Sequence, residues 1–376
     1  GQLGLELSPA KGVRVSGRIA HDGIRYRDRL IYDDPEPGGG GDVGPFRDFG
    51  FDRWTSADLR VRWETDLAVS ATVGATVEHH RTVLDAFAER IPTLPEDPVD
   101  GLGVGPIRKS FAIVNGYVIG EWRPVRTFAV HAGLTAYSHS LFGGRVTPKG
   151  AVVWRATRQD TVKAILSEGF RAPAASEAFF NDAIDYIPNL DLRPETARAV
   201  ELAWERRMGS TASLFVSAFV AQYGHLIRVE SVPRPGLVGP PDPADPTDYR
   251  QQARNGGRFG TRGVEIGGRV RLASLGEAYG GVVWQILQGE EPANTASWTA
   301  NASLTSRALW KPLTLALRTA LVGPRRKDVT AVVPGTKSAV ATQVRLDGSA
   351  TVEVPGVRGL ALELGIQNLL DAATLH

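Results

Sequence analysis

Apolar and polar side chains alternate along extended stretches of this chain, and no other sequence feature constrains its fold as strongly. In the stretch 264–272, one face reads Val264, Ile266, Gly268, Val270 and Leu272, and the other reads Glu265, Gly267, Arg269 and Arg271. Because successive side chains of a strand point to opposite faces, such a stretch predicts a strand with one apolar and one charged face. Repeated along a chain, the pattern predicts a closed barrel with lipid outside and water inside.

The same alternation recurs in segments spread over the whole chain. They cover residues 13–19, 59–64, 200–205, 313–318 and 360–367. Each matches the two-residue period of a strand, and none sustains the period of a helix. We therefore predict an all-β protein, with helix expected only locally, at 176–183 inside a loop.

The composition fits a membrane barrel as well as an ordinary soluble protein. Of 376 residues, 42% are hydrophobic, and the mean hydropathy is −0.14, because the polar lumen of a barrel dilutes its lipid-facing residues. The sequence has no run of about 18 apolar residues, which excludes a membrane-spanning helix. A formal net charge of +2 argues against a nucleic-acid partner. The absence of cysteine rules out a disulfide scaffold and suits an exported chain.

Two kinds of connection separate the alternating segments. The short ones are turns near residues 9–12, 64–67, 123–126, 157–160, 207–211, 274–277, 310–312 and 355–358. The long ones are rich in Gly, Pro or polar residues and cover 33–50, 92–108, 138–147, 168–194, 231–257, 288–295 and 323–335. Short turns that alternate with long loops predict an antiparallel up-and-down barrel wall of about 16 strands, with periplasmic turns and extracellular loops.

A soluble β-sandwich also alternates its faces, so the choice of a membrane barrel depends on two further features. Several predicted strands run to about ten residues or more, whereas globular strands mostly have about 5–6. In addition, five tryptophans lie close to short turns, namely Trp63, Trp122, Trp154, Trp204 and Trp310. Indole rings at one level form the aromatic girdle of a membrane protein, which favours the barrel.

Short motifs in a characteristic order resemble the barrel of TonB-dependent outer-membrane receptors. That family opens a long extracellular loop with a phrase of the type G-x-F-R-A-P-x-x-x-E and enters the next strand after N-L-x-P-E. The matching residues here are Phe170, Arg171, Ala172, Pro173, Glu177, Asn189, Leu190, Pro194 and Glu195. Later motifs of the family, G-V-E and N-L-F-D, are matched by Gly263, Glu265, Asn368, Leu369 and Asp371. The resemblance extends over residues 110–371.

We interpret these motif residues as marks of barrel architecture and not of chemistry. Pro173 and Pro194 lack an amide hydrogen and stop a strand ladder, so they bracket a loop. Gly263 suits a close approach of two backbones where a strand enters the barrel. Asn368 and Asp371 favour a tight turn.

The resemblance implies a 22-stranded barrel whose lumen holds an N-terminal plug, with a short box that engages TonB. In this chain, alternation begins at once in residues 3–7, residue 1 is Gly, and the sequence stops at His376 after a turn that should precede one more strand. We therefore expect residues 1–376 to be one receptor-like barrel domain, a fragment that lacks the plug, the first strands and the last strand. Such an open sheet has two unpaired edges and is not expected to form a sealed barrel alone.

No pattern in the sequence indicates catalysis or a metal site, so we predict a protein that is not an enzyme, with no cofactor. His79 and His80 are adjacent and point to opposite faces of a strand, which prevents them from sharing a metal. Zinc-protease and serine-hydrolase motifs are missing from the sequence. Ser138 beside His139 is disfavoured as a catalytic pair because adjacent strand residues diverge.

The candidates for ligand binding lie in a loop and on the charged face. The loop 231–257 holds six prolines and fits either a plain surface loop or a loop that captures substrate. In the second case Tyr249, Arg250 and Arg254 contact the ligand. Arginines of the charged face are further candidates to attract an anionic ligand, namely Arg60, Arg62, Arg269, Arg271 and Arg318.

The resemblance leads to the hypothesis of an active importer in the outer membrane of a Gram-negative bacterium. It implies a siderophore-iron complex, cobalamin or a glycan as the transported ligand. The implied partners are outer-membrane lipid and the TonB complex, which acts through the plug domain. Two alternatives stay open, a passive porin-type channel, for which about 16 strands is a usual size, and a soluble or surface-attached glycan-binding β-protein.

Overall fold

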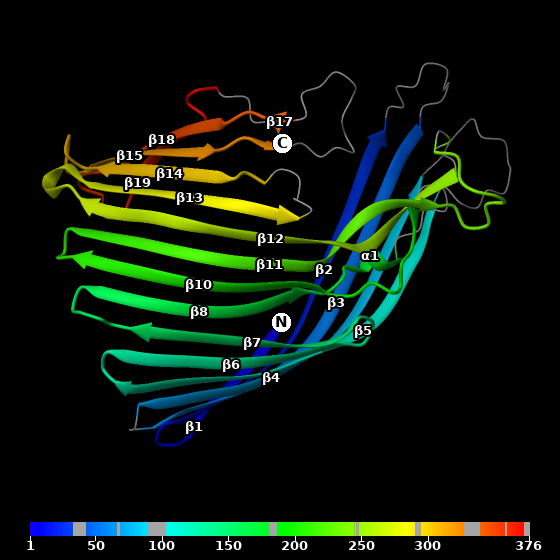
Figure 1. Ribbon diagram of the computed structural model, residues 1–376, viewed down its shortest axis with the longest axis horizontal. Helices are drawn as coiled ribbons and strands as arrows, with labels where there is room; N and C mark the ends of the chain where they lie inside the picture. Colours follow the sequence, from blue (N-terminus) through cyan, green and yellow to red (C-terminus); the bar gives the residue numbers. More distant parts are fainter. Residues whose placement is uncertain are drawn as a thin grey trace.

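The protein is almost entirely β-structure (Figure 1). The computed structural model describes residues 1–32, 43–65, 68–88, 103–179, 186–243, 245, 248–289, 295–326, 339–357 and 359–371. This part contains a short helix α1 (Ala175–Phe179) and a 3-10 turn η2 (Ala273–Leu275). None of its helices combines the length and apolarity needed to cross a membrane. The helix expected at 176–183 is thus present in its first turn, and residues 180–183 lie outside the described residues.

The strands coincide with the alternating segments of the sequence and extend them. They are β1 (Gln2–Ala10), β2 (Val13–Tyr32), β3 (Val43–Glu64), β4 (Val69–Ala88), β5 (Gly103–Val125), β6 (Phe128–His139), β7 (Gly143–Trp154), β8 (Asp160–Arg171), β9 (Tyr186–Ile187), β10 (Glu195–Met208), β11 (Ala212–Pro233), β12 (Tyr249–Arg271), β13 (Glu277–Gly289), β14 (Trp298–Ser306), β15 (Leu313–Val322), β16 (Arg325–Arg326), β17 (Ala339–Val340), β18 (Gln343–Glu353) and β19 (Ala361–Ile366).

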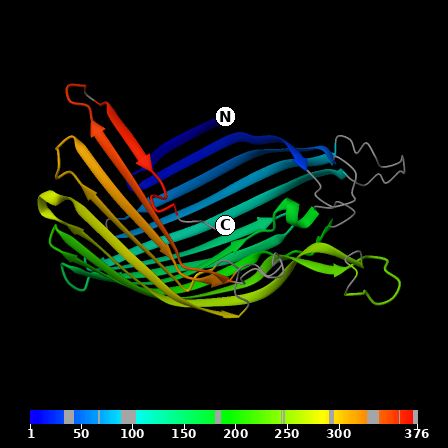
Figure 2. The same cartoon turned by 90° about the horizontal axis from the view of Figure 1, so that it is seen from above.

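Seventeen strands form one sheet, and β16 pairs with β17 separately. Apart from the two-residue β9, which pairs in parallel with β12, each strand of the sheet pairs antiparallel with the next one along the chain. This up-and-down order of sixteen strands confirms the predicted fold class. Figure 2 shows the sheet curving into a trough-shaped wall, with β1 and β19 towards its two edges.

The two ends of the wall differ. Short turns gather at the left edge of Figure 1, which we call the turn end, and the longer connections lie at the opposite loop end. Six strands, β2 to β5 together with β11 and β12, have 20 to 23 residues each. Since about 9–11 tilted residues span a bilayer, these strands continue well beyond its thickness at the loop end.

The loops predicted at 138–147, 168–194 and 231–257 are wrong in extent. β6 and β7 are joined by residues 140–142 and not by 138–147, because Gly143, at a φ of 78°, makes a tight turn. Pro148 is tolerated inside β7 because the β7–β8 ladder already ends at Lys149. The loop expected at 168–194 begins only after β8 ends, and β11 and β12 replace both flanks of the loop expected at 231–257.

Large parts of the other predicted loops cannot be compared with the structure. Residues 43–50 belong to β3 and residues 103–108 to β5, so the loops predicted at 33–50 and 92–108 were also too long. The rest of these two loops and most of 288–295 and 323–335 lie outside the described residues. The last residue of the turn predicted at 355–358 also lies outside the described residues, as does His376.

One face of the wall is apolar over much of its length. Leu3, Leu5 and Leu7 of β1 are 76%, 63% and 51% exposed, and the same alternation continues on the following strands. The opposite, concave face carries the charged residues. We call these the outward and inward faces. Within the described residues no large side chain is fully buried, so the apolar outward side chains have no protein layer to pack against.

The predicted tryptophan positions are reproduced at the turn end. Trp63 and Trp154 stand at or next to the last residue of their strands, and each is about half exposed. Trp122 pairs with Val69, the first residue of β4. Trp204 lies deeper and donates a hydrogen bond from Nε1 to Asp160 at 3.2 Å.

Candidate functional site

The inward face carries a stack of aromatic rings that lies about halfway along β3 to β5 and ends at the last residue of β6. Trp54, His80, Phe111 and His139 come from β3, β4, β5 and β6, so every ring belongs to a different strand. Their centroids are separated by 5.6, 4.8 and 4.7 Å in that order, with interplanar angles of 15°, 7° and 23°. Antiparallel register places the first three directly opposite one another. The alternation that sends Arg60 inward sends Trp54 inward as well.

The stack continues from the wall into the loop that contains α1. The ring centroids of His139 and Phe142 are 4.7 Å apart, and those of Phe142 and Phe179 of α1 are 6.1 Å apart. Lys109 places its Nζ 4.5 Å from the centre of the Phe179 ring, a cation–π contact. We call the six rings Trp54, His80, Phe111, His139, Phe142 and Phe179 the aromatic ladder.

Carboxylates hold the His80 ring of the ladder in place. Its Nδ1 lies 3.1 Å from an Asp52 oxygen, and its Nε2 lies 3.1 Å from a Glu78 oxygen. Thr82 donates to the other Asp52 oxygen at 3.0 Å. Both ring nitrogens of His80 therefore lie within hydrogen-bond distance of a carboxylate, which fixes the orientation of the ring.

The two adjacent histidines diverge as predicted. The Nε2 of His79 contacts Ser110 at 3.0 Å, on the face opposite to that of His80. No cluster of three or more His, Cys, Asp or Glu able to hold a metal ion occurs in the described ranges. Because the rings stack face to face, the ladder presents to the lumen a row of ring edges together with one ammonium group and fixed carboxylates, a surface suited to binding a ring-containing ligand.

The motif residues around α1 meet in one cluster, which we call the loop clasp and define as Arg171, Glu177 and Glu195. Arg171 donates two parallel hydrogen bonds of 2.9 Å to Glu177, and its Nε donates to Glu195 at 2.6 Å. The backbone N–H of Ala174 donates to Glu177 at 2.7 Å, and that of Ile227 donates to Glu195 at the same distance. The clasp thus joins the end of β8, α1, the start of β10 and β11.

The clasp lies at the loop end of β8 and β10, and the charges of its three side chains stabilise one another. Partial burial opposes ionisation of Glu195, but hydrogen bonds from Arg171 and from the N–H of Ile227 outweigh it, so the pKa of Glu195 lies below its ordinary value. The carboxylates of Glu195 and Glu177 raise the pKa of Arg171.

Asparagines fasten the second half of this loop. Asn189 donates to the carbonyl of Ala253 at 2.8 Å. Asn255 accepts from the N–H of Arg193 at 2.7 Å and donates to the carbonyls of Arg193 and His225 at 2.8 and 2.7 Å. Leu192, buried with Ala178 and Ala253, forms a small hydrophobic core here.

The remaining residues of the first motif lie around the clasp. The ring centroids of Phe170 and Tyr137 are 4.6 Å apart. Pro173 is buried, Ala172 and Pro194 are half-buried, and the side chain of Leu190 is exposed. The two prolines flank the excursion between β8 and β10, as expected.

The later motif residues lie where the backbone demands them. A Cβ on Gly263 would meet the carbonyl oxygen of Trp284 at 2.4 Å, which accounts for glycine there, and Glu265 follows it on the inward face. Asn368 and Asp371 adopt positive φ, and Asp371 donates its N–H to the carbonyl of Asn368 in a tight turn. Leu369 donates its N–H to the carbonyl of Leu346 at 2.7 Å.

The three residues expected in a ligand-capturing loop are not in a loop. Tyr249, Arg250 and Arg254 belong to β12 and pair with Pro233, Val232 and Arg228 of β11, in that order. The polar run misled the prediction because backbone hydrogen bonds of a two-stranded ribbon need no apolar side chains. Their part in ligand binding stays a prediction, and they are not next to the aromatic ladder in the sheet order.

The geometry defines a class of protein before any comparison: an antiparallel β-barrel wall that faces lipid on one side and an aqueous lumen on the other. A family model described as TonB dependent receptor-like, beta-barrel, matches residues 1–369. The chain belongs to this family, and its transmembrane barrel fold and recognition from motifs are thereby confirmed.

Solved structures have the same fold at low sequence identity. A mutant of the ferric enterobactin receptor PfeA from Pseudomonas aeruginosa matches with a TM-score of 0.70 at 16% identity, over 95% of this chain and 54% of that chain. The ferric yersiniabactin uptake receptor FyuA from Yersinia pestis gives 0.70 at 15%, over 98% and 55%. The copper transporter OprC gives 0.72 at 14%, over 98% and 59%.

This chain thus spans a little more than half the length of each of these proteins. No curated protein sequence matches the chain.

Proposed function

We propose that this chain is the wall of an outer-membrane receptor that imports a scarce, large ligand with energy supplied through TonB. Its family membership supports the proposal, as do the roles printed for its structural neighbours, a ferric enterobactin receptor, a ferric yersiniabactin uptake receptor and a copper transporter. These are transport receptors, so the protein acts by binding and passage and not as an enzyme. The Gram-negative outer membrane is the corresponding location.

The aromatic ladder carries the proposal. It presents a row of aromatic ring edges on the inward side, on the path of a ligand that enters from the loop end. Lys109 adds a cation at the junction with α1. A siderophore-iron complex, which combines aromatic or heteroatom-rich groups with negative charge, fits this surface best, and cobalamin and a glycan are the other members of the proposed ligand class.

The proposal includes two partners beyond the ligand. Because the chain spans a little more than half of each neighbour's length, a plug domain outside it is proposed to fill the lumen and to contact TonB. The outward apolar face is the surface for outer-membrane lipid. Residues 1–376 then constitute one barrel domain of the receptor.

Two other functions each have one observation in their favour. Sixteen strands in the wall are a porin-like number, which favours a passive channel. Aromatic side chains also bind sugars, and the aromatic ladder therefore favours a soluble or surface-attached glycan-binding protein. Dependence of uptake on TonB distinguishes the receptor from a passive channel. Retention of the protein in the membrane after washing distinguishes the receptor from a soluble or surface-attached glycan-binding protein.

The test is ligand uptake by cells that lack the gene and are complemented with variants. Ferric siderophores, cobalamin and oligosaccharides are supplied one at a time, with and without a functional tonB gene. Phe111→Ala, which removes a ladder ring, is expected to reduce uptake of one ligand by about tenfold, since a base-sized stacked ring contributes about 1–3 kcal/mol. Tyr279→Ala is the matched control, because Tyr279 is an inward aromatic residue at the turn end, opposite Arg269 and Ser303.

Uptake of the ligand is expected to disappear without TonB and to be normal in Tyr279→Ala. Uptake that persists without TonB would instead establish the passive channel. Equal loss in Phe111→Ala and Tyr279→Ala would remove the ladder as the ligand-binding surface.

A further inference from the structure

The connections at the turn end of the wall are basic. Their sequences are 11–12, 65–68, 126–127, 155–159, 209–211, 272–276, 307–312 and 354–360. Together they contain seven lysine and arginine residues and a single acidic one, Asp66. Asp66 and Arg358 lie outside the described residues. Because the whole chain has a formal net charge of only +2, this excess belongs to one end of the wall and not to the composition in general.

Four of these basic residues are exposed and lack a carboxylate partner among the described residues. We call them the turn cations: Arg126, Arg155, Arg158 and Lys311. Within the described ranges none of them makes an ion pair or a side-chain hydrogen bond. Arg206, in the adjoining strand β10, does pair with Asp160. The turn cations thus keep a positive charge that the wall itself does not neutralise.

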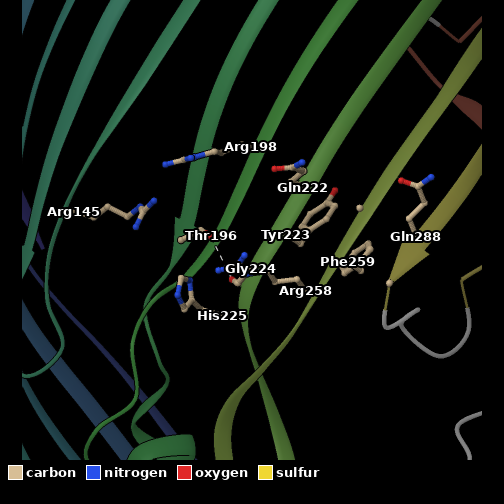
Figure 3. A pocket seen from close by; sticks show the side chains of 12 residues that line it. Arg145, Thr196, Arg198, Gln222, Tyr223, Gly224, His225, Arg258, Phe259 and Gln288 are labelled. Carbon is tan, nitrogen blue, oxygen red and sulfur yellow. Dashed lines mark hydrogen bonds between the residues drawn. The ribbon is translucent and has the colours of Figure 1, made fainter.

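At the opposite, loop end a carboxylate holds two guanidinium groups. Glu168 accepts from Nη2 of Arg145 at 2.5 Å and from Nε of Arg198 at 2.9 Å, beside an open cavity of about 490 Å3 that both arginines line (Figure 3). The described connections at the turn end offer no such group, since they contain no Asp or Glu. Exposed cations are hydrated and stable without a partner, but their concentration at one end attracts anions to that end.

The turn cations are spread along the rim of the wall. They belong to three turns, β5–β6, β7–β8 and β14–β15, at the edge where the short turns gather (Figure 1). The first and the last of these turns are eight strand spacings apart in the sheet, which is roughly 40 Å at about 4.8 Å per strand. A partner that contacts all three turns is therefore extended.

One of the turn cations faces away from lipid. Phe128 is opposite Trp154, and the N–H of Arg155 donates to the carbonyl of Thr127 at 2.7 Å, so regular pairing continues one residue past the end of β7. Trp154 shares the outward face with Val152, and alternation then places Arg155 on the inward face. Lipid contacts only the outward face, so lipid headgroups do not account for Arg155.

We propose that the turn cations bind the carboxylates of peptidoglycan, the anionic polymer that underlies the outer membrane. The proposal rests on the proposed function, which puts the turn end in the periplasm. A network that repeats its peptide carboxylates at intervals matches a line of separated cations, since guanidinium and ammonium groups both pair with carboxylates. Each exposed pair is weak, and several pairs made at once give useful affinity. Contact with this layer holds the wall in place while the plug is pulled.

The experiment measures how the natural gene product, purified from outer membranes in detergent, binds to isolated peptidoglycan sacculi from which protein has been removed. Co-sedimentation gives an apparent Kd. The variant R126Q/R155Q/R158Q/K311Q is expected to bind about tenfold more weakly than the wild type, because four exposed ion pairs together contribute about 1.4 kcal/mol. Sacculi whose carboxyl groups have been amidated are expected to bind the wild type as weakly, and added salt is expected to weaken binding to native sacculi.

The matched control is R14Q/R18Q/R307Q/R345Q, which removes the same number of charges from arginines that pair with Glu6, Asp58, Glu353 and Asp347. Its binding to sacculi is expected to equal that of the wild type, because carboxylates of the wall already neutralise these arginines. Heat-modifiable gel mobility verifies folding. If R126Q/R155Q/R158Q/K311Q fails this check, the comparison of native and amidated sacculi with the wild type decides.

Three outcomes would overturn the proposal: wild-type affinity in R126Q/R155Q/R158Q/K311Q, undiminished binding to amidated sacculi, or equal loss in the two fourfold variants. Binding of the wild type to vesicles of phosphatidylglycerol but not to sacculi would also overturn it and would assign the turn cations to lipid headgroups. None of these measurements involves uptake. Loss of TonB-dependent uptake would therefore refute the proposed importer alone, and absence of sacculus binding would refute only the proposed contact with peptidoglycan.

Discussion

An arginine placed on the outward face should be costly, and one placed on the inward face at the same depth should not. β14 provides the comparison, because its outward row is Trp298, Ala300, Ala302 and Leu304 and its inward row is Thr299, Asn301, Ser303 and Thr305. Ala302 and Asn301 are adjacent, and both are exposed. The two variants Ala302→Arg and Asn301→Arg therefore add the same charge to opposite faces of one strand.

The expected magnitude follows from the position of Ala302. It lies at the centre of the nine-residue strand, opposite Gly280 and Thr319. Four residues of antiparallel strand cover about 13 Å, and a strand tilt of about 40° leaves about 10 Å of depth to either end. An arginine there sits near the bilayer midplane, where the cost is about 2–4 kcal/mol. Asn301→Arg, facing water, should change stability by about 0.5 kcal/mol or less.

A third variant tests how the cost of an outward arginine depends on its depth in the bilayer. Val270 is outward but one residue from the end of β12, so Val270→Arg should cost only about 0–1 kcal/mol. The assay is urea unfolding of the natural gene product reconstituted in lipid vesicles, read by gel mobility and tryptophan fluorescence. Equal costs for Ala302→Arg and Asn301→Arg, or an inverted order, would refute the assignment of lipid to the outward face.

Three further predictions concern the loop clasp and the packing of the wall. Arg171→Lys keeps the charge but loses the two-pronged contact with Glu177, so we expect about 1–2 kcal/mol of local destabilisation, seen as faster proteolysis between residues 172 and 194. Because the pKa of Glu195 is lowered in the folded protein, its contribution is present above its ordinary pKa and lost as the pH falls through the lowered value. Pepsin should therefore cut this loop increasingly as the pH drops below about 4.3, and a wild-type pH dependence in Glu195→Gln would contradict the assignment. Gly263→Ala should cost about 1–3 kcal/mol in urea unfolding, since its Cβ meets backbone at 2.4 Å, whereas Gly169→Ala, with no atom within 4 Å, should be nearly neutral.

Alternation and turn residues were enough to predict the fold class. The stretch 264–272 lies almost wholly in β12, and the predicted turns occur between consecutive strands wherever both flanks are described. Loop lengths were overestimated because glycine, proline and polar residues do not prevent strand pairing outside lipid. At the loop end water surrounds both faces, so the two-residue pattern fades while the backbone ladder continues, as in residues 249–258 of β12.

The candidate site could be predicted only in part. The divergence of His79 and His80 follows from strand geometry alone and is confirmed. Neither Trp54 nor Phe111 was predicted, because the ladder depends on which residues of four strands stand opposite one another. That register is set by turn geometry at the far end of each strand, and shifting one strand by a single residue would move its ring to the other face.

The same register also determines where the lipid-facing surface ends. On β10 and β11 the outward positions are apolar up to Val200 and Val220, and the next outward residues are Arg198 and Gln222. The strands themselves continue without interruption, so the boundary is chemical and not a break in the sheet. A charged outward residue at this level reaches the headgroups, whereas the same residue at Ala302 would be surrounded by acyl chains. Moving the boundary therefore tests it: Gln222→Leu should be tolerated, while Val220→Gln should cost more than Gln222→Leu in the vesicle assay, and equal effects would place both residues outside lipid.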